Sequence, residues 1–208
     1  MKKGFFIVFE GPDRSGKSTQ AALLKAWLEE NGFDVILTRE PGGTALSEQV
    51  RKILLDPNEK VSPLAELFLF SASRSQHTAE IIKPAIAAGK IVISDRFTLS
   101  TEAYQGYGRG LPLDEIQTIN NIASESIQPD LTILFDIPEQ EFEKRMRAEE
   151  TKNGTDRFES EHLDFRRKIH KAYKDFAQRK GIKKIDASKS IDDIRKEVLR
   201  LVKEIIIK

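Results

Sequence analysis

A glycine-rich segment near the start of the chain has the residue types and the spacing that hold phosphate groups. It lies between an apolar run at 5–10 and a helical stretch, and it matches the P-loop pattern G-x-x-x-x-G-K-[ST] with Gly11-Pro12-Asp13-Arg14-Ser15-Gly16-Lys17-Ser18, followed by Thr19. The glycines permit backbone turns that aim successive N–H groups at one anion, and the next helix adds the positive end of its dipole. A chance glycine turn would lack this strand-loop-helix context, so we predict a nucleotide-phosphate site.

Three side chains near this segment predict how the phosphates are handled. Lys17 is expected to reach the β- and γ-phosphates, and the Ser18 hydroxyl is expected to bind Mg²⁺. Asp95 ends another apolar run, where an ionised carboxylate needs a partner or a metal. Since Mg²⁺ prefers oxygen ligands and water, we predict that Ser18 and Asp95 share one magnesium site.

A P-loop is common to GTPases, motors and small-molecule kinases, so other features must separate these classes. The sequence has no Asn-Lys-x-Asp tetrapeptide of the kind that recognises guanine, which counts against a Ras-like GTPase. At 208 residues, the chain is also short for a motor with separate coupling elements. These two observations favour a small-molecule kinase over a GTPase or a motor.

The overall composition limits the partners further. The 34 basic and 33 acidic side chains leave a formal net charge of +1, so no global field draws the chain to a nucleic acid polymer or an anionic membrane. There is no cysteine, which excludes disulfides and thiolate metal sites and suits a cytoplasmic protein. The apolar run at 5–9 is too short for a signal-peptide core or a membrane span.

Short β-rich runs alternate with longer helical stretches along the chain. The expected strands are 5–10, 35–38, 91–94, 131–136 and 183–186, and the expected helices are 17–31, 65–88, 113–126, 138–150, 162–180 and 191–206. Nearly continuous apolar strands are typical of parallel sheets that are buried on both faces. We therefore predict an α/β fold with a parallel sheet, whose ligands bind at the carboxyl ends of the strands.

Four further motifs, taken with the P-loop, resemble the bacterial thymidylate kinase family in order and spacing. They are Arg39-Glu40-Pro41-Gly42-Gly43-Thr44, Phe70-Ser71-Ala72-Ser73-Arg74, Asp95-Arg96-Phe97 and Ser100-Thr101-Glu102-Ala103-Tyr104-Gln105-Gly106. The resemblance covers nearly the whole chain and implies a P-loop nucleoside monophosphate kinase fold, with a five-stranded parallel sheet in the order 2-3-1-4-5. It also implies that residues 1–208 form one domain that transfers the γ-phosphoryl group of ATP to dTMP, with Mg²⁺, as a cytoplasmic homodimer.

The resemblance assigns the acceptor base and phosphate to residues of these motifs. Phe70 is expected to stack on the thymine ring, although on its own it would be assigned to the core, and Arg74 to contact an exocyclic oxygen of the base. Arg39 and Arg96 follow two strands, and they are expected to hold the phosphate of dTMP with their planar guanidinium groups. Pro41 is expected to follow a cis peptide bond that fixes Arg39.

The same resemblance assigns the sugar and the remaining contacts to dTMP. Asp13 is expected to contact the 3′-hydroxyl group, and Thr101 and Gln105 are expected to hydrogen-bond the substrate. Tyr104 is expected to fill the space that a ribose 2′-hydroxyl needs, and so to select deoxyribonucleotides.

A polar, charge-rich segment at 145–159 resembles the family's lid over ATP, although by composition alone it would be a surface loop. A lid excludes water, so transfer outcompetes hydrolysis, and Arg145 and Ala187 are expected to contact ATP. Two sources are open for the cation that stabilises the transferring phosphoryl group. We favour Arg14 in the P-loop, and the alternative is a basic residue of the lid, namely Arg147, Lys152 or Arg157.

The expected mechanism needs no covalent intermediate. Because the acceptor is already an anionic oxygen, we expect catalysis by alignment and by the charges of Lys17, Arg14, Arg96 and Mg²⁺. Two alternatives stay open: another P-loop nucleotide or deoxynucleoside kinase, and a regulatory module that binds ATP without turnover. We assign no chemical role to the histidines, which are expected at the surface: His77, His162 and His170.

Overall fold

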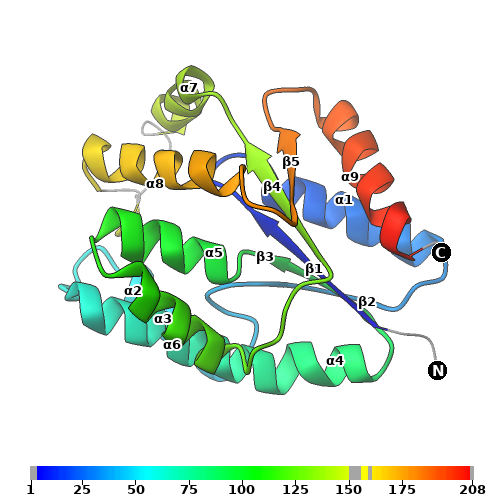
Figure 1. The fold of residues 1–208 in the computed structure, drawn as a ribbon, viewed down its shortest axis with the longest axis horizontal. Helices are drawn as coiled ribbons and strands as arrows, with labels where there is room; N and C mark the ends of the chain where they lie inside the picture. Colours follow the sequence, from blue (N-terminus) through cyan, green and yellow to red (C-terminus); the bar gives the residue numbers. More distant parts are fainter. Residues whose placement is uncertain (1–3, 150–155, 159–160, 207–208) are drawn as a thin grey trace.

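Parallel strands form the centre of the molecule (Figure 1). The computed structural model describes residues 4–149, 156–158 and 161–206, and for 146–149 it describes the backbone alone. Within these residues the strands are β1 (Phe5–Glu10), β2 (Val35–Arg39), β3 (Ile91–Asp95), β4 (Leu131–Asp136) and β5 (Ile182–Asp186). All neighbours pair in parallel and follow the order β2-β3-β1-β4-β5, which confirms the order implied by the family resemblance.

The register of the strands brings polar residues together at the carboxyl ends of the strands, which we call the carboxyl edge of the sheet. Phe9 of β1 and Arg39 of β2 both pair with Asp95 of β3, and Glu10 directly follows Phe9. Because the strands run the same way, the loop after β1 leaves the sheet at this edge too. The edge is where the sequence predicted the ligands to bind.

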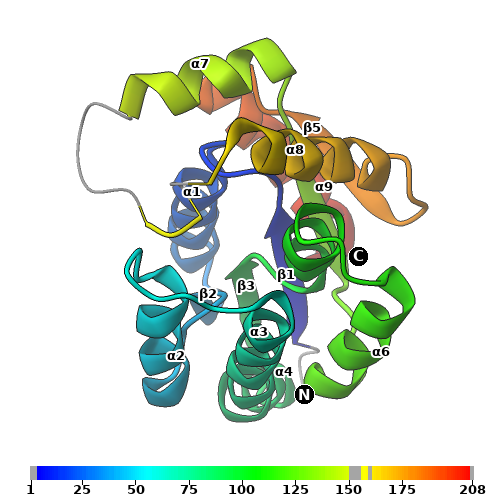
Figure 2. The same cartoon turned by 90° about the vertical axis from the view of Figure 1, so that its left-hand side faces the viewer.

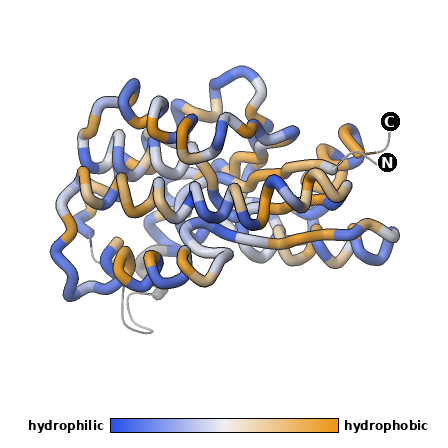
Figure 3. Tube along the Cα trace, turned by 90° about the horizontal axis from the view of Figure 1, so that it is seen from below, coloured by the Kyte–Doolittle hydropathy of each residue, from blue (hydrophilic) through white to orange (hydrophobic). Residues whose placement is uncertain are grey.

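Helices cover both faces of the sheet (Figures 1 and 2). On one face, α1 (Lys17–Glu30) and α9 (Ile191–Ile206) lie side by side and share a core with the strands. The other face packs against η1, α4 and α8, with α3 and α6 in the same layer. Their bounds are α3 (Pro63–His77), η1 (Thr78–Ile82), α4 (Lys83–Ala87), α6 (Leu113–Ala123) and α8 (Leu163–Phe176). Hydrophobic and hydrophilic residues alternate along the helices, as expected for helices with one buried side (Figure 3).

The remaining helices lie around the carboxyl edge of the sheet. They are α2 (Ala45–Leu55), α5 (Thr98–Thr101), η2 (Glu102–Gly108) and α7 (Glu139–Glu149). α5 and η2 form one continuous helical run that contains the motif from Ser100 to Gly106. No helix in the described part of the chain has the length and apolar character of a membrane span.

Two helical predictions differ from the structure. The sequence did not predict α2, because only Ser47 and Leu54 of this helix are buried and its apolar periodicity is weak. The signal that could have predicted it is the N-cap residue Thr44, whose hydroxyl accepts a hydrogen bond of 3.1 Å from the Ser47 N–H. The predicted helix at 65–88 stays helical but widens into the π-helical turn η1. That turn directly precedes α4, where Pro84 lacks the N–H group that an α-helical turn requires.

Candidate active site

The P-loop leads into an open helix N-terminus. Gly11 and Gly16 have φ angles of 143° and 92°, and a Cβ atom at Gly11 would lie 2.7 Å from the carbonyl oxygen of Phe135. Gly16 is the N-cap of α1 and makes no side-chain capping bond, and the first turn has no acidic residue. The N–H groups of this turn are therefore left for an anionic ligand, as the sequence motif predicted.

The ammonium group of Lys17 lies inside this loop. It donates a hydrogen bond of 2.7 Å to the carbonyl oxygen of Pro12, and the residue is buried. Burial and the nearby Arg96 lower the pKa of Lys17 to about 8, although Asp95 and Asp13 act in the opposite direction. A bound phosphate would add the negative charge that favours the protonated lysine.

Ser18 and Asp95 meet at the edge of the sheet. The Ser18 hydroxyl donates a hydrogen bond of 2.5 Å to Oδ2 of Asp95, while Oδ1 is buried and has no hydrogen-bond partner among the described residues. A hydroxyl and an unpaired carboxylate oxygen fit Mg²⁺, which takes one or two protein ligands beside phosphates and keeps several waters. The part of the chain that the structure describes contains no group of three or more His, Cys, Asp or Glu side chains suited to a metal.

Arg96 links the P-loop to the predicted sugar-binding residues. Its backbone is left-handed, with φ of 79°, and its guanidinium group pairs with Asp13 and donates a hydrogen bond of 3.1 Å to the Gly11 carbonyl. Burial alone would raise the pKa of Asp13, but Arg96 and Lys17 hold it at about 2. Asp13 is therefore a carboxylate at neutral pH.

The buried carboxylate of Glu10, which the sequence analysis did not assign to the site, shares two hydrogen-bond partners with Arg96. Glu10 is fully buried and accepts hydrogen bonds of 2.7 Å from the Ser100 hydroxyl and 3.2 Å from the Tyr173 hydroxyl. Arg96 donates to the same two hydroxyls, at 3.0 and 3.1 Å. Burial raises the pKa of Glu10. The available sequence signal was an acid at the end of an apolar strand, the same signal that identified Asp95.

Two adjoining cavities collect most of the predicted site residues. A pocket beside the P-loop is lined by Asp13, Pro41, Phe70, Arg74, Arg96, Thr101, Tyr104 and Gln105. A wider cleft at the mouth of the P-loop is lined by Asp13, Arg14, Gly16, Lys17, Ser18, Thr19, Arg39, Asp95, Arg96 and Arg145. We call these the acceptor pocket and the phosphate cleft. Four residues line both: Asp13, Glu40, Arg51 and Arg96.

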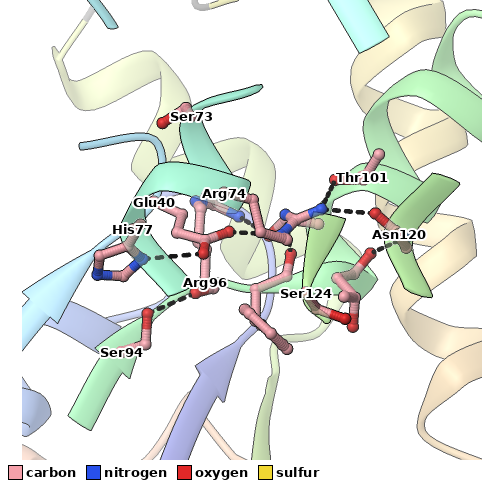
Figure 4. A network of polar contacts seen from close by, with 12 residues as sticks. Glu40, Ser73, Arg74, His77, Ser94, Arg96, Thr101, Asn120 and Ser124 are labelled. Carbon is pink, nitrogen blue, oxygen red and sulfur yellow. Dashed lines mark hydrogen bonds and ion pairs between the residues drawn. The ribbon is translucent and has the colours of Figure 1, made fainter. Parts of the chain in front are cut away.

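The guanidinium group of Arg74 is fixed by an extensive hydrogen-bond network (Figure 4). Arg74 is 1% exposed and donates to Oε2 of Glu40 at 2.8 Å, to Oγ1 of Thr101 at 2.9 Å and to the carbonyl oxygen of Phe97 at 2.9 Å. It also donates to Oδ1 of Asn120 at 2.5 Å. Arg74 thus reaches the acceptor pocket as a rigid group, not as a solvated helix residue.

The segment after β2 enters both cavities. The Glu40–Pro41 peptide bond is cis, as predicted. Arg39 is exposed in the phosphate cleft and pairs with Glu48 at 3.2 Å. Arg51 donates a hydrogen bond of 2.9 Å to the Pro41 carbonyl oxygen and lines both cavities. Sequence reasoning missed Arg51 because it missed α2.

Arg145 and Ala187, both predicted to contact ATP, lie together. Arg145 donates a hydrogen bond of 3.0 Å to the Ala187 carbonyl oxygen and another of 3.2 Å to the Arg14 carbonyl oxygen. The segment after β5 is therefore connected to the P-loop through one side chain.

The two candidate sources of the transition-state cation differ in position. Arg14 lines the phosphate cleft. Arg157 donates a hydrogen bond of 2.6 Å to Glu66 and is buried with it. The side chain of Arg147 lies outside the described residues, as do Lys152 and the rest of 150–155, and residue 159, of the predicted lid.

Comparison with known proteins places this site in a family. A family model described as thymidylate kinase matches residues 9–198. The chain belongs to the thymidylate kinase family. A thymidylate kinase of Halothermothrix orenii is 43% identical over 206 residues, covering 99% of this chain and 100% of that protein. One of Chromobacterium violaceum is 44% identical over 201 residues, covering 96% of this chain and 93% of that protein.

A solved structure agrees with this placement. The crystal structure of thymidylate kinase from Ehrlichia chaffeensis matches with a TM-score of 0.79 and 34% identity, covering 97% of this chain and 99% of that one. Membership of the thymidylate kinase family confirms the resemblance drawn from the motifs. With the observed sheet order, it also confirms the P-loop nucleoside monophosphate kinase fold.

The histidines of this thymidylate kinase family member contradict one expectation. His77 and His170 are 0% and 8% exposed, so their assignment to the surface is wrong. The His77 ring lies 3.0 Å from Oε1 of Glu40 and 2.7 Å from the Thr38 hydroxyl, while His170 donates a hydrogen bond of 2.8 Å to the Ile137 carbonyl oxygen. Both occur on charged helices but face partners that are distant in the sequence.

Proposed function

We propose that the chain transfers the γ-phosphoryl group of ATP to the 5′-phosphate of dTMP, giving dTDP and ADP. The observation that supports this most strongly is that the phosphate cleft and the acceptor pocket share Asp13 and Arg96 in their walls. Direct transfer between two nucleotides requires that their phosphates meet in one geometry. Arg96 lines both cavities, which supports a role in binding the phosphates of both nucleotides.

In this proposal ATP binds in the phosphate cleft. The open N–H groups at the start of α1 and the ammonium group of Lys17 bind its phosphates. Arg145 and Ala187 lie beside the P-loop and contact the rest of ATP. Ser18 and Asp95 hold Mg²⁺, which when bound neutralises charge on the β- and γ-phosphates.

dTMP binds in the acceptor pocket. Phe70, half-buried in its wall, stacks on the thymine ring, while Arg74, Thr101 and Gln105 hydrogen-bond the base. Asp13 binds the 3′-hydroxyl group, and Tyr104 occupies the space of a 2′-hydroxyl. Arg39 and Arg96 hold the 5′-phosphate. Arg96 lies in the wall that the two cavities share, and the cis turn at Pro41 follows Arg39 closely in the chain.

Charge neutralisation then drives the transfer. Lys17, Arg14 and Arg96 surround the region where the two phosphates meet, and Arg14 stabilises the transferring group. Because the acceptor oxygen is anionic, none of these residues has to remove a proton from it.

We extend the proposal to the organisation of the protein. Residues 1–208 form one domain in which 145–159 acts as a lid, and the protein works in the cytoplasm as a homodimer. On α3, Leu64 is 49% exposed and Phe68 is 54% exposed, so this helix has apolar surface for a second copy.

Initial rates with ATP test the proposal against its alternatives. The acceptors to compare are dTMP, dUMP, UMP, CMP and AMP, and dTMP is expected to give the highest kcat/KM. Faster turnover of UMP or CMP would indicate another nucleotide kinase. Nucleotide binding without release of ADP would indicate a regulatory module.

A further inference from the structure

Phe158 lies in the wall of the acceptor pocket beside two of its proposed binding residues. Its ring centroid is 5.8 Å from that of Phe70 and 5.8 Å from that of Tyr104, and its side chain is 8% exposed. Phe70 and Tyr104 are proposed to contact the base and the sugar. A third aromatic ring therefore touches both sides of the nucleoside site.

Residues 156–158 belong to no regular element, and the end of α2 holds them in place. The N–H and Nε groups of Arg157 donate hydrogen bonds of 3.1 and 2.8 Å to the carbonyl oxygens of Leu55 and Leu54. These carbonyls end a helix and have no partner within it. Asp156 accepts a hydrogen bond of 2.9 Å from the Phe158 N–H, which turns the chain toward the pocket.

A polar cluster around the buried Glu66, which we call the Glu66 cluster, fixes the side chain of Arg157. It consists of Glu66, Gln105, Arg109, Arg157 and Glu161. Glu66 is 0% exposed and accepts hydrogen bonds of 2.6 Å from Arg157, 2.8 Å from Gln105 and 3.1 Å from Arg109. Arg109 also pairs with Glu161 at 2.5 Å, so two carboxylates balance two guanidinium groups.

The position of Glu66 on α3 connects this cluster to the nucleoside site. Glu66, Phe70 and Arg74 are spaced four residues apart and share one face of the helix. Glu66 binds Gln105, and Arg74 binds Thr101, which is four residues before Gln105. The two polar contacts join α3 to the α5–η2 run on either side of Phe70, and Phe158 packs on the ring of Phe70 between them.

We propose that Phe158 is a further residue that binds the nucleoside of the acceptor, and that Glu66 positions it through Arg157. The aromatic ring supplies an apolar surface for a pyrimidine deoxynucleoside, and the carboxylate of Glu66 keeps that ring in the pocket wall. This inference rests on the proposed binding of dTMP in the acceptor pocket.

Steady-state kinetics separate this role from a general structural role. Phe158→Leu keeps apolar volume but removes the ring, and we expect the KM for dTMP to rise about tenfold, equivalent to about 1.4 kcal/mol. Glu66→Gln keeps the shape but removes the charge, and the same rise is expected. For both variants, kcat and the KM for ATP are expected to stay within about twofold of wild type.

Glu102→Gln is the matched control for Glu66→Gln. Glu102 is also a buried carboxylate, it lies on the neighbouring η2, and it pairs with Arg179 at 2.8 Å outside the acceptor pocket. We expect this variant to leave the KM for dTMP unchanged. We expect the double variant Glu66→Gln/Phe158→Leu to raise the KM for dTMP by less than the product of the two single effects, because both changes act on the ring of Phe158, while Glu66 also binds Gln105.

A fluorescence measurement reports on the ring directly. Trp27 is the single tryptophan of the sequence, so Phe158→Trp in a Trp27→Phe background gives one reporter in the acceptor pocket. dTMP is expected to shift its emission and ATP alone is not, and Glu66→Gln is expected to abolish the shift. A KM for dTMP that stays at the wild-type value in both kinetic variants, or an emission that dTMP does not change, would overturn the inference. Failure of wild type to phosphorylate dTMP would instead overturn the proposed function.

Discussion

The hydroxyl group of Tyr104 donates a hydrogen bond of 2.6 Å to Oδ2 of Asp13, while Arg96 binds the other oxygen of the same carboxylate. Burial raises the pKa of Tyr104 well above its ordinary value of 10.0, so the hydroxyl stays protonated and remains a donor. The residue proposed to exclude a 2′-hydroxyl is therefore bonded to the residue proposed to bind the 3′-hydroxyl. Its ring is held in place before a sugar arrives.

This arrangement predicts selection of the sugar by Tyr104. Wild type should prefer dTMP over its ribonucleotide analogue by roughly tenfold to a few hundredfold in kcat/KM, because an unpaired buried hydroxyl costs about 1–3 kcal/mol. Tyr104→Ala should lose part of the preference, whereas Tyr104→Phe, which keeps the ring, should retain it. Absence of a preference in wild type would remove this role from Tyr104, and an unchanged preference in Tyr104→Ala would place the selection elsewhere.

Arg14→Gly tests the source of the transition-state cation. Arg14 has a left-handed backbone with φ of 62°, which glycine adopts readily, so the loop should keep its shape. We expect kcat to fall by about 10³-fold or more, with a much smaller rise in the KM for dTMP. The measurement is single-turnover kinetics with saturating ATP. An unchanged rate would transfer the role to Arg147 or Lys152, since Arg157 is bound to Glu66.

The lowered pKa of Lys17 predicts a pH effect on ATP binding. Above about pH 8 the nucleotide-free protein loses the proton of Lys17, while bound phosphates favour the charged form. The kcat/KM for ATP should therefore fall as pH rises through this value, and ATP binding should take up a proton there. Calorimetry in buffers of different ionisation enthalpy measures that uptake. Lys17→Ala should lose the uptake and lower turnover by about 10²-fold or more.

The lowered pKa of Lys17 also predicts that the stability of the fold rises with pH, whereas the kcat/KM for ATP falls. Its pKa of about 8 in the folded protein lies below the ordinary value of 10.5, so between these values the unfolded chain binds more protons. The contribution of Lys17 to the free energy of unfolding should therefore rise with pH across this window and be unfavourable at pH 7. Lys17→Met should raise Tm at pH 7, by about 2–4 °C for each kcal/mol relieved. A lower Tm would show that the contacts of Lys17 outweigh its desolvation.

Glu40 is expected to stabilise the fold through its charge. Burial alone would raise the pKa of Glu40, but Arg74 and His77 hold it below its ordinary value of 4.5. The stabilisation is therefore complete above about pH 4.5 and is lost as pH falls through the lower folded-state pKa. Glu40→Gln leaves Arg74 buried without its partner and should cost about 3–5 kcal/mol at pH 7.

Urea unfolding of wild type and Glu40→Gln at several pH values measures this effect. The difference between the two proteins should be constant near neutral pH and shrink in acid. A difference that does not depend on pH would mean that packing, and not the charge of Glu40, is responsible.

The strands and the P-loop were predictable because their signals are local. Residues 5–9 of β1 are all apolar, and an acid that ends such a run, as Glu10 and Asp95 do, is expected at the carboxyl end of a strand in a parallel sheet. The buried charged residues were not predictable in the same way. Glu66 and Arg157 are 91 residues apart in the sequence, and Glu40 and Arg74 are 34 apart. A local hydropathy pattern assigns such residues to the surface, because their partners appear only after the chain has folded.

Arg96 finds five acceptors for its two terminal nitrogens within its own chain: Gly11, Asp13, Ser100, Tyr104 and Tyr173. A guanidinium group kept bare for the substrate would be left desolvated and unpaired each time a product departed. If Arg96 binds the 5′-phosphate as proposed, the phosphate has to displace some of these acceptors, and the same acceptors are available to the guanidinium group again when the product leaves. The intramolecular bonds would then spare the empty site a buried, unpaired guanidinium group.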